Sequence, residues 1–443
     1  MSVLDRPVGR SGALFSYAFC PWTERRCAMT AILHGNIIHA PQFGTLEMIP
    51  NGYLVLEDGV LAECCAALPQ RYAGLPVTDY GNALIMPSFA DLHLHAPQYP
   101  MLGMGMDLPL LEWLDAYTFR TEARFADLDY ARRVYRQLAQ DLISSGTTRV
   151  SAFASRHTDA ALVLMEELER AGVAGYVGKV NMDRNAGPSQ EETGESVAET
   201  LRWLENCRFE LVKPILTPRF TPSCSDRLME ELGKIARERD LPVQSHLSEN
   251  TGEIAWVREL HPGCRQYWET YDQYGLWKER TLMAHCVHSD AREQEAMVRA
   301  GVWAVHCAAS NVNLCSGTAP VRELLENGVQ VALGSDIAGG DQLAMNRVAV
   351  MSIRASKLKS METGRPFLTV PEAYYLSSTA GHLYFGGGAG FQTGHKLHAV
   401  VVDDSAMPEP ARELTLAERF ERCIYLMEKR HIKAVYSEGV NRI

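Results

Sequence analysis

The central part of the chain alternates short apolar runs with amphipathic stretches of helical periodicity. Helical candidates such as 160–171 and 225–239 separate eight strand-like runs. The eight runs lie at 89–95, 148–153, 174–180, 211–216, 243–246, 281–285, 302–306 and 329–336. Eight alternating units predict an α/β protein with a (β/α)8 TIM-like barrel. A doubly wound sheet is the structural alternative, but it gives no reason for polar residues at the ends of so many strands.

Both chain ends have a different pattern, in which tight turns separate short strands. Turns at Asn51-Gly52, Asp58-Gly59 and Gly81-Asn82 divide the apolar runs that follow residue 31, which is a hairpin signal. Strand-like runs return at 396–402 and 432–436. The pattern predicts a small β-sandwich domain formed from both chain ends. The expected division is a poorly ordered extension at 1–29, the small domain at 30–86 and 386–443, and the barrel at 87–385.

Composition narrows the partners and the compartment. The 443 residues carry a net charge of −11, and such an acidic surface repels phosphate backbones. We therefore expect no nucleic-acid partner, although a neutral free base is not disfavoured. The 11 cysteines include no Cys-x-x-Cys spacing, which favours a reducing cytoplasm over a disulfide framework. The first 29 residues lack a signal-peptide pattern, and no apolar run reaches the roughly 18 residues that predict a membrane span.

Two histidines end the first of the eight runs. Side chains two residues apart on a strand point to the same face, so His93 and His95 point together and the neighbouring leucines point away. Paired imidazoles at the carboxyl end of a barrel strand are typical of half a zinc site. Taken alone, however, such a pair is as often two ordinary polar side chains without a functional role.

Later runs end in further polar residues. His246 ends the fifth run, and Glu249 follows three residues later. His285 and Asp336 end the sixth and eighth runs. The carboxyl ends of barrel strands converge on one face. A lone histidine there is more often a packing residue, but four histidines and a carboxylate in this order favour a metal centre.

These residue types predict a hydrolase. A zinc ion with three imidazoles and one carboxylate keeps a position open for water and lowers the pKa of that water from about 15.7 to about 7. One carboxylate can accept the water proton, and a second can protonate the attacked group. Asp336 and Glu249 suit these two catalytic roles. The structural alternative for Glu249 alone is a surface carboxylate on a loop.

The same residues carry a resemblance to a known family. Residues 87–95, together with His246, His285 and 334–336, resemble the amidohydrolase superfamily of metal-dependent hydrolases. Within it, the chain from about residue 87 to about residue 341 is similar to the guanine deaminase family. The similar stretches are 95–99, 107–114, 177–180, 213–220, 244–250 and 336–340.

The resemblance implies a homodimer that hydrolyses guanine to xanthine and ammonia through a metal-activated hydroxide. It implies one Zn²⁺ held by four side chains, those of His93, His95, His246 and Asp336. The same ligands suit Fe²⁺. In this family pattern His285 contacts the attacking water, and Glu249 protonates the ring nitrogen beside the attacked carbon.

The resemblance also implies a set of substrate contacts. They come from Gln98, Arg219, Phe220, Glu249, His285 and Asp336. Gln98 can read a purine edge with a donor and an acceptor, and Arg219 offers a fixed fork of donors for the guanine carbonyl oxygen. The structural alternatives are an ion pair on the barrel rim for Arg219 and plain packing for Phe220. Trp113 is a candidate for a lid anchor or a core residue.

The sequence departs from the family pattern at a few positions. Ala308-Ala309 replace a usual Pro-Asn pair, and Ser335 replaces a usual threonine. His398 stands where relatives usually carry an aspartate. None of these positions is an expected metal ligand, so the departures concern a loop and the small domain rather than the reaction class.

Four other functions compete with this one. A deaminase or hydrolase of a related heterocycle, such as 8-oxoguanine, a pterin, a triazine or an adenosine derivative, would keep the centre and change the pocket. A binuclear hydrolase needs a carboxylated lysine at the end of the fourth strand, where Arg219 and Phe220 stand. A non-catalytic scaffold has no reason to keep every ligand. A zinc-cysteine nucleic-acid deaminase needs Pro-Cys-x-x-Cys, which this sequence lacks.

Overall fold

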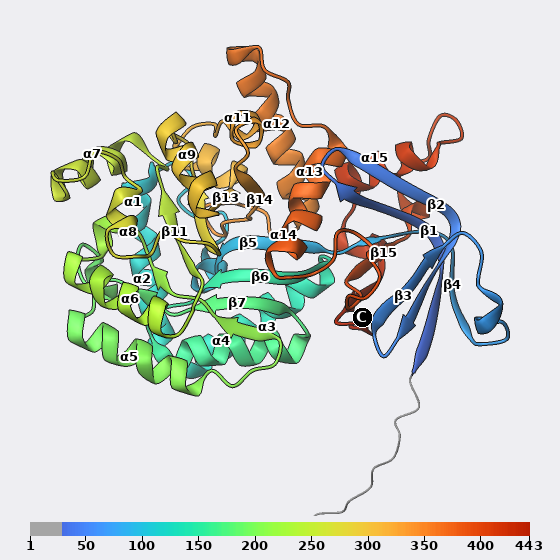
Figure 1. Ribbon diagram of the computed structural model, residues 1–443, viewed down its shortest axis with the longest axis horizontal. Coiled ribbons are helices and arrows are strands. Elements are labelled where there is room, and N and C mark those ends of the chain that lie inside the picture. Colours follow the sequence, from blue (N-terminus) through green and yellow to red (C-terminus); the bar gives the residue numbers. More distant parts are fainter. Residues whose placement is uncertain (1–28) are drawn as a thin grey trace, which may run out of the picture.

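The computed structural model describes residues 29–443 (Figure 1). The extension expected at 1–29 therefore falls, except for Met29, outside the described residues. The described strands form one sheet of seven strands, two sheets of four and one pair. No helix in this part of the chain is both long and apolar enough to cross a membrane.

Two four-stranded parallel sheets form the centre of the molecule. One contains β5 (Phe89–His95), β6 (Thr147–Phe153), β7 (Ala174–Gly178) and β9 (Val212–Pro214). The other contains β11 (Val243–Leu247), β12 (Thr281–His285), β13 (Trp303–His306) and β14 (Gln330–Leu333). A short parallel pair completes this region, formed by β8 (Val180–Asn181) and β10 (Thr217–Pro218). The eight runs predicted from the sequence thus occur as parallel strands in chain order.

Backbone hydrogen bonds connect the two four-stranded sheets at both edges. Gln244 N, in β11, donates to Leu216 O at 2.9 Å. At the other edge, Asp336 N donates to His93 O at 2.8 Å. β14 ends at Leu333, earlier than the predicted residue 336, because the chain leaves the strand and turns to pair Asp336 with β5.

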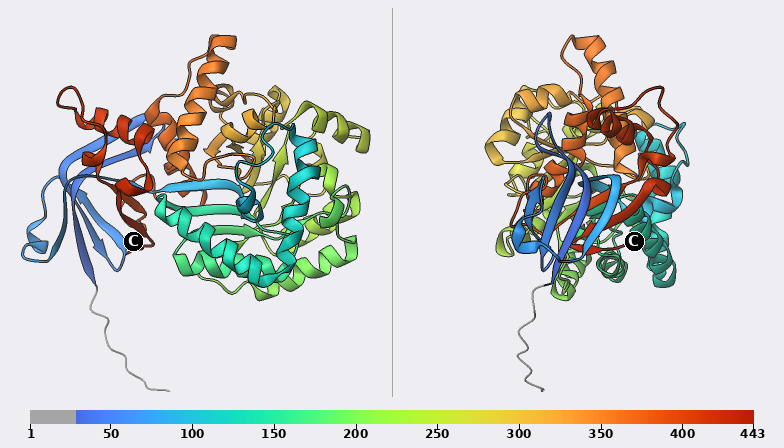
Figure 2. Two further views of the ribbon diagram at one scale, coloured as in Figure 1. Left: turned by 180° about the vertical axis from the view of Figure 1, so that it is seen from behind. Right: turned by 90° about the vertical axis from the view of Figure 1, so that its right-hand side faces the viewer.

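Helices surround these central strands (Figures 1 and 2). The long ones are α3 (Leu128–Ser144), α4 (Thr158–Ala171), α5 (Thr193–Asn206), α6 (Asp226–Glu238), α7 (Thr251–Leu260), α9 (Ala291–Ala300) and α12 (Met345–Thr363). The short ones are α1 (Leu110–Trp113), α2 (Phe119–Ala123), α8 (Glu269–Asp272), α10 (Ala308–Asn313), α11 (Val321–Glu326), α13 (Val370–Ser377) and α14 (Thr379–Tyr384). In α6, Leu228, Leu232 and Ile235 recur at helical spacing and are buried, while the Ser225 side chain caps the first turn.

Both chain ends meet in the seven-stranded sheet, where blue and red strands lie side by side in Figure 2. Its order is β17 (Val440–Asn441), β16 (Ile432–Ser437), β15 (Ala399–Val402), β4 (Val77–Pro87), β1 (Thr30–Gln42), β2 (Thr45–Glu57) and β3 (Val60–Cys65). β4 pairs with β1 on one side and with β15 on the other. Hydrogen bonding through β4 joins strands from the two chain ends in one sheet. α15 (Leu416–Leu426), which the sequence analysis did not predict, interrupts the C-terminal strands.

A buried polar chain lies where this sheet meets β6. Thr148 Oγ1 donates to His398 Nδ1 at 2.9 Å, and His398 Nε2 donates to Glu438 Oε1 at 2.9 Å. Burial lowers the pKa of His398 to about 4, so the ring is neutral and can accept at one nitrogen while it donates at the other. The unusual His398 therefore links the seven-stranded sheet to the central strands.

Replacing His398 tests this link. We expect His398→Leu to lower the free energy of unfolding by about 1–3 kcal/mol, because the Thr148 hydroxyl and the Glu438 carboxylate lose a buried partner. Urea unfolding measures the change. The control His395→Leu alters the same segment at a half-buried position and should cost less than about 0.5 kcal/mol. Equal losses in both variants would contradict the assignment.

Candidate active site

Three imidazoles converge at the carboxyl ends of β5 and β11. His93, His95 and His246 each place one ring nitrogen within 4.8 Å of the others. His95 Nε2 and His246 Nε2 are 3.1 Å apart. Two nitrogens of a tetrahedral zinc site, with Zn–N bonds of about 2.05 Å, lie about 3.3 Å apart. The spacing therefore fits a shared metal ion.

The imidazoles have the neutral form that metal ligands require. Burial lowers the pKa of His95 and of His246 well below the usual range. His246 Nδ1 lies 2.6 Å from the carbonyl oxygen of Arg219. Because a carbonyl only accepts, Nδ1 carries the proton and Nε2 presents its lone pair to the site.

Asp336 brings a carboxylate oxygen to two of these three imidazoles. Its Oδ1 lies 3.1 Å from His93 Nε2 and 3.6 Å from His95 Nε2. Burial opposes ionisation, but the imidazoles of His93 and His285 outweigh it and hold the pKa of Asp336 well below its usual range. Asp336 has a φ of 48°, a left-handed conformation that costs energy for a residue with a side chain. The expected ligand residues thus lie near one another, and their imidazole nitrogens and carboxylate oxygen are donors that a divalent metal ion can bind.

His285 and Glu249 form a second layer beside this group. His285 Nε2 lies 3.4 Å from Glu249 Oε2 and 3.7 Å from Asp336 Oδ2. Burial works against protonation of His285, but Glu249 and Asp336 prevail and raise its pKa. Burial also raises the pKa of Glu249 to about 7. Glu249 is therefore a buried carboxyl that can hold or release a proton near neutral pH, and not the surface carboxylate of the structural alternative.

Hydrogen bonds hold both residues of this layer in place. His285 Nδ1 donates to Asn311 Oδ1 at 2.8 Å, and Ser316 Oγ donates to Glu249 Oε1 at 3.0 Å. The sequence analysis missed Asn311 and Ser316. Asn311 lies on α10, which begins at Ala308 where a loop was expected, and Ser316 follows this helix.

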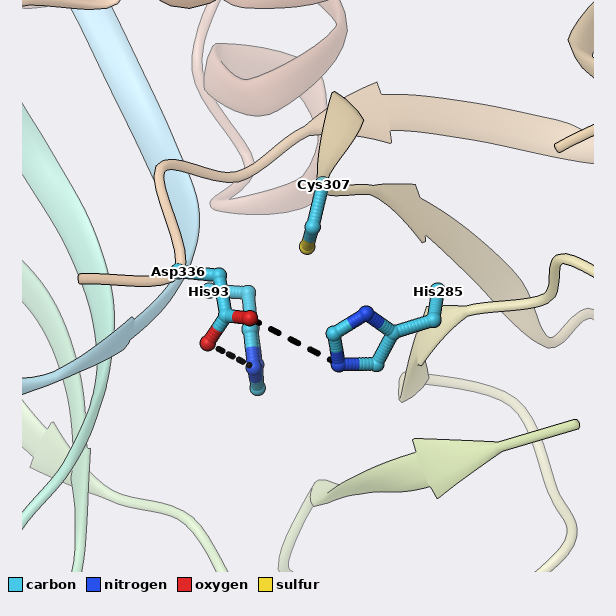
Figure 3. Close-up of side chains that lie close together, drawn as sticks. All are labelled: His93, His285, Cys307 and Asp336. Carbon is cyan, nitrogen blue, oxygen red and sulfur yellow. Dashed lines mark ion pairs between the residues drawn. The ribbon is translucent and has the colours of Figure 1, made fainter. Parts of the chain in front are cut away.

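Cys307 is a further donor that the sequence analysis missed. Its thiol points toward His93, His285 and Asp336, and the four donor atoms lie within 4.8 Å of one another (Figure 3). Burial raises the pKa of Cys307 well above the usual range, so the thiol is neutral. No spacing pattern marked it, since it simply follows the last residue of β13.

A cavity of about 400 Å³ opens beside these groups. It is lined by His95, Gln98, Leu110, Trp113, Leu114, Arg219, Phe220, His246, Glu249, His285, Leu314 and Asp336. A larger hollow of about 1990 Å³ on the same measure lies against the seven-stranded sheet and Asp403, but no imidazole lines it. Since all the residues expected to contact a substrate face the smaller cavity, that cavity is the candidate active site.

Besides the imidazoles, both polar and apolar groups line the cavity. Gln98 and Arg219 are each only 2% exposed, and both contact the buried carboxylate of Glu122, which the sequence analysis missed. Arg219 therefore combines the two alternatives left open by the sequence, because it faces the cavity and also forms an ion pair. Phe220 likewise lines the cavity and packs in an apolar cluster with Trp113.

Comparison with known proteins identifies the family. The profile of the Amidohydrolase family matches residues 84–440. The chain belongs to this family. The resemblance inferred from the sequence is therefore confirmed, and the histidines at the strand ends are interpreted as residues of an amidohydrolase.

Its similar proteins include several guanine deaminases. That of Dictyostelium discoideum is 35% identical over 440 residues, which cover 92% of this chain and 97% of the relative. That of Homo sapiens is 37% identical over 375 residues, 81% of this chain and 82% of the relative. A crystal structure of guanine deaminase from C. acetobutylicum with bound guanine is 42% identical, with a TM-score of 0.91, and the match covers 93% of this chain and all of that one. An adenosine deaminase from Xanthomonas campestris with bound zinc, 20% identical with a TM-score of 0.79, shares the fold.

Proposed function

We propose that this protein is a guanine deaminase, which converts guanine and water to xanthine and ammonia. The observation that carries the proposal is one cavity that joins the cluster of imidazoles and Asp336 to Gln98 and Arg219, two side chains with the hydrogen-bonding groups for a purine. Full-length similarity to guanine deaminases, one of them with guanine bound, supports this choice of substrate.

The metal centre consists of His93, His95, His246 and Asp336. His93 Nε2 is a buried ring nitrogen without a hydrogen bond, which supports a bound cation. We propose one Zn²⁺ per chain, with Fe²⁺ as the alternative that the same donors accept. When bound, such an ion lowers the pKa of a water molecule so that hydroxide forms at neutral pH.

The surrounding residues move the protons. Asp336 accepts the proton of the attacking water and passes it to the departing amine. Glu249 protonates the ring nitrogen beside C2, and its pKa of about 7 suits a group that gives and regains a proton near neutral pH. His285, held by Asn311, contacts the attacking water or the intermediate through its other ring nitrogen. The amino group leaves as ammonia, and the carbon keeps the water oxygen.

Gln98, Arg219 and Phe220 hold the purine. Gln98 offers a donor and an acceptor to one edge of the ring, and Arg219 donates to the carbonyl oxygen. The ring of Phe220 covers the base, at the boundary between the cavity and the apolar cluster. Trp113 encloses the cavity, with its Nε1 donating to Met104 O at 2.9 Å.

We also propose a finer architecture and setting. The eight parallel strands close a (β/α)8 barrel over 87–385, supported by the hydrogen bonds at both sheet edges. Residues 30–86 and 386–443 form the small domain, whose sheet curls into two layers around one apolar cluster that includes Leu33 and Val401.

The protein acts as a cytoplasmic homodimer on a small-molecule purine, without nucleic acid or membrane. Each of the nine cysteines described is unbridged, in keeping with a reducing compartment.

Ammonia release with guanine tests the proposal. We expect rapid conversion to xanthine by protein with about one metal ion per chain, measured by elemental analysis. Parallel assays use 8-oxoguanine, isoxanthopterin, adenine and cytosine. Turnover of another ring but not guanine would keep the reaction class and discard the substrate. Inactivity toward all of them with metal present would favour a non-catalytic scaffold.

A further inference from the structure

Glu122 is a buried carboxylate behind the cavity wall. It lies on α2, is 3% exposed and is not among the cavity-lining residues. Its Oε1 accepts a hydrogen bond from Gln98 Nε2 at 2.9 Å, and its Oε2 accepts one from an Arg219 terminal nitrogen at 2.5 Å. One carboxylate thus joins two cavity residues that come from distant parts of the chain.

We propose that Glu122 is a positioning residue that fixes how Gln98 and Arg219 present their hydrogen-bonding groups to the purine. The proposal rests on the proposed function and deepens it. Glu122 acts through the two residues it contacts and not on the reacting atoms, so it helps to determine which ring is bound.

The first argument concerns the orientation of the Gln98 amide. A glutamine amide turned by 180° keeps its shape but exchanges donor and acceptor. The Glu122 carboxylate only accepts, so it requires the NH2 group on its side. The backbone N of Ala338 donates to Gln98 Oε1 at 3.1 Å and requires the oxygen on the other side. Both contacts allow one orientation only.

This orientation matches one edge of guanine. Gln98 keeps one N–H and one oxygen lone pair free, in a fixed order along the cavity wall. A purine edge with an acceptor nitrogen beside an N–H presents the complementary pair. With the amide reversed, donor would face donor and acceptor would face acceptor, so the fixed orientation discriminates among rings of similar size.

The second argument concerns the charge of Arg219. Its guanidinium is 2% exposed, and a buried cation needs a compensating partner. Glu122 supplies the charge from α2, and the Phe119 ring of the same helix lies 5.3 Å from Arg219 Cζ. The ion pair is neutral overall. The remaining N–H groups of Arg219 can therefore bind the carbonyl oxygen of an uncharged base.

Substitution of Glu122 by glutamine tests the proposal. Glu122→Gln keeps the size but replaces one accepting oxygen with a donating NH2 group. We expect KM for guanine to rise at least about 30-fold, because both purine-binding side chains lose their fixed partner. We expect kcat to fall less than about tenfold, because Gln98 and Arg219 contact the purine equally in the ground state and in the transition state. The metal content should stay unchanged.

The chain offers a matched control. Glu191 Oε1 lies 2.8 Å from Lys179 Nζ in another buried ion pair, with side chains 2% and 0% exposed, and neither residue lines the cavity. Glu191→Gln should destabilise the protein but leave KM for guanine unchanged. If both variants raise KM equally, the effect belongs to any broken buried pair, and the proposal fails.

Further variants connect Glu122 to Gln98 and guard against misfolding. Combining Glu122→Gln with Gln98→Leu should raise KM little beyond the larger of the two single effects, because both substitutions remove the same interaction. Glu122→Asp keeps the charge but shortens the reach, and should raise KM in a folded protein.

The outcomes separate the two proposals. A wild-type protein that does not turn over guanine refutes the proposed function. An active wild type with an unchanged KM in the folded Glu122 variants overturns the positioning role. If both Glu122→Gln and Glu122→Asp fail to fold or lose the metal, Glu122 serves the fold, which overturns the role as well.

Discussion

Glu249→Gln is expected to lower kcat for guanine deamination by about 10²- to 10⁴-fold while the protein keeps its metal. Glutamine retains the shape of the side chain and can still accept the hydrogen bond from Ser316. It cannot deliver a proton to the ring nitrogen, so the leaving step loses its acid. Steady-state kinetics and elemental analysis of the same sample measure both quantities.

Glu293→Gln is the matched control for this experiment. Glu293 is a buried glutamate with a pKa that burial raises to about 7, as in Glu249, but it does not line the cavity. Its replacement should leave kcat within about twofold of wild type. A Glu249→Gln variant with bound metal and full activity would refute the proton-transfer role of Glu249.

The convergence of the expected ligand residues was predictable because their signal is local. His93 and His95 share a strand face at a spacing of two, and His246 ends a strand of strong apolar character. Strand order then fixes which ends converge. Asp336 was placed correctly beside them, although its strand ends three residues earlier and the residue itself lies in a left-handed turn.

The residues that hold the site in place were not predictable in the same way. Glu122 lies on a five-residue helix among other charges, where the sequence looks like an exposed helical face. Its role depends on the approach of Arg219, which lies after another strand. Cys307 and Asn311 likewise come close to the site only because β12 and β13 lie side by side. Such partners are set by tertiary packing, and no spacing rule within one segment reveals them.

In the small domain, too, the strands could be predicted from local patterns but their pairing could not. Alternation and turns predicted strands at both chain ends, and they are present. No local pattern indicates that β4 pairs with both β1 and β15, since a register across separate segments depends on the faces they bury. The helix α15 was not predicted, although Phe420, Cys423 and Ile424 recur at helical spacing and form its buried face.

The largest effect is expected from His246→Ala, which should reduce turnover of guanine to the background rate and lower the metal content well below about one ion per chain. His246 is the residue for which the structure gives the most complete reason. Its Nδ1 is bound to the Arg219 carbonyl, so the ring cannot turn away, and Nε2 faces His95 Nε2 at 3.1 Å. Removing this ring takes away one donor and leaves the remaining two imidazoles and Asp336 with an open side.

His306→Ala distinguishes a lost ligand from a lost histidine. His306 ends β13, is 2% exposed, and belongs to neither candidate group of metal donors. We expect His306→Ala to keep its metal and to retain turnover, even if its stability falls. Wild-type protein stripped with a chelator should lose activity and regain it with Zn²⁺ or Fe²⁺, whereas His246→Ala should not recover at the same metal concentration. Recovery of His246→Ala to the wild-type rate would show that the metal is held elsewhere, because a site that has lost one of its four donors binds its ion too weakly to fill under those conditions.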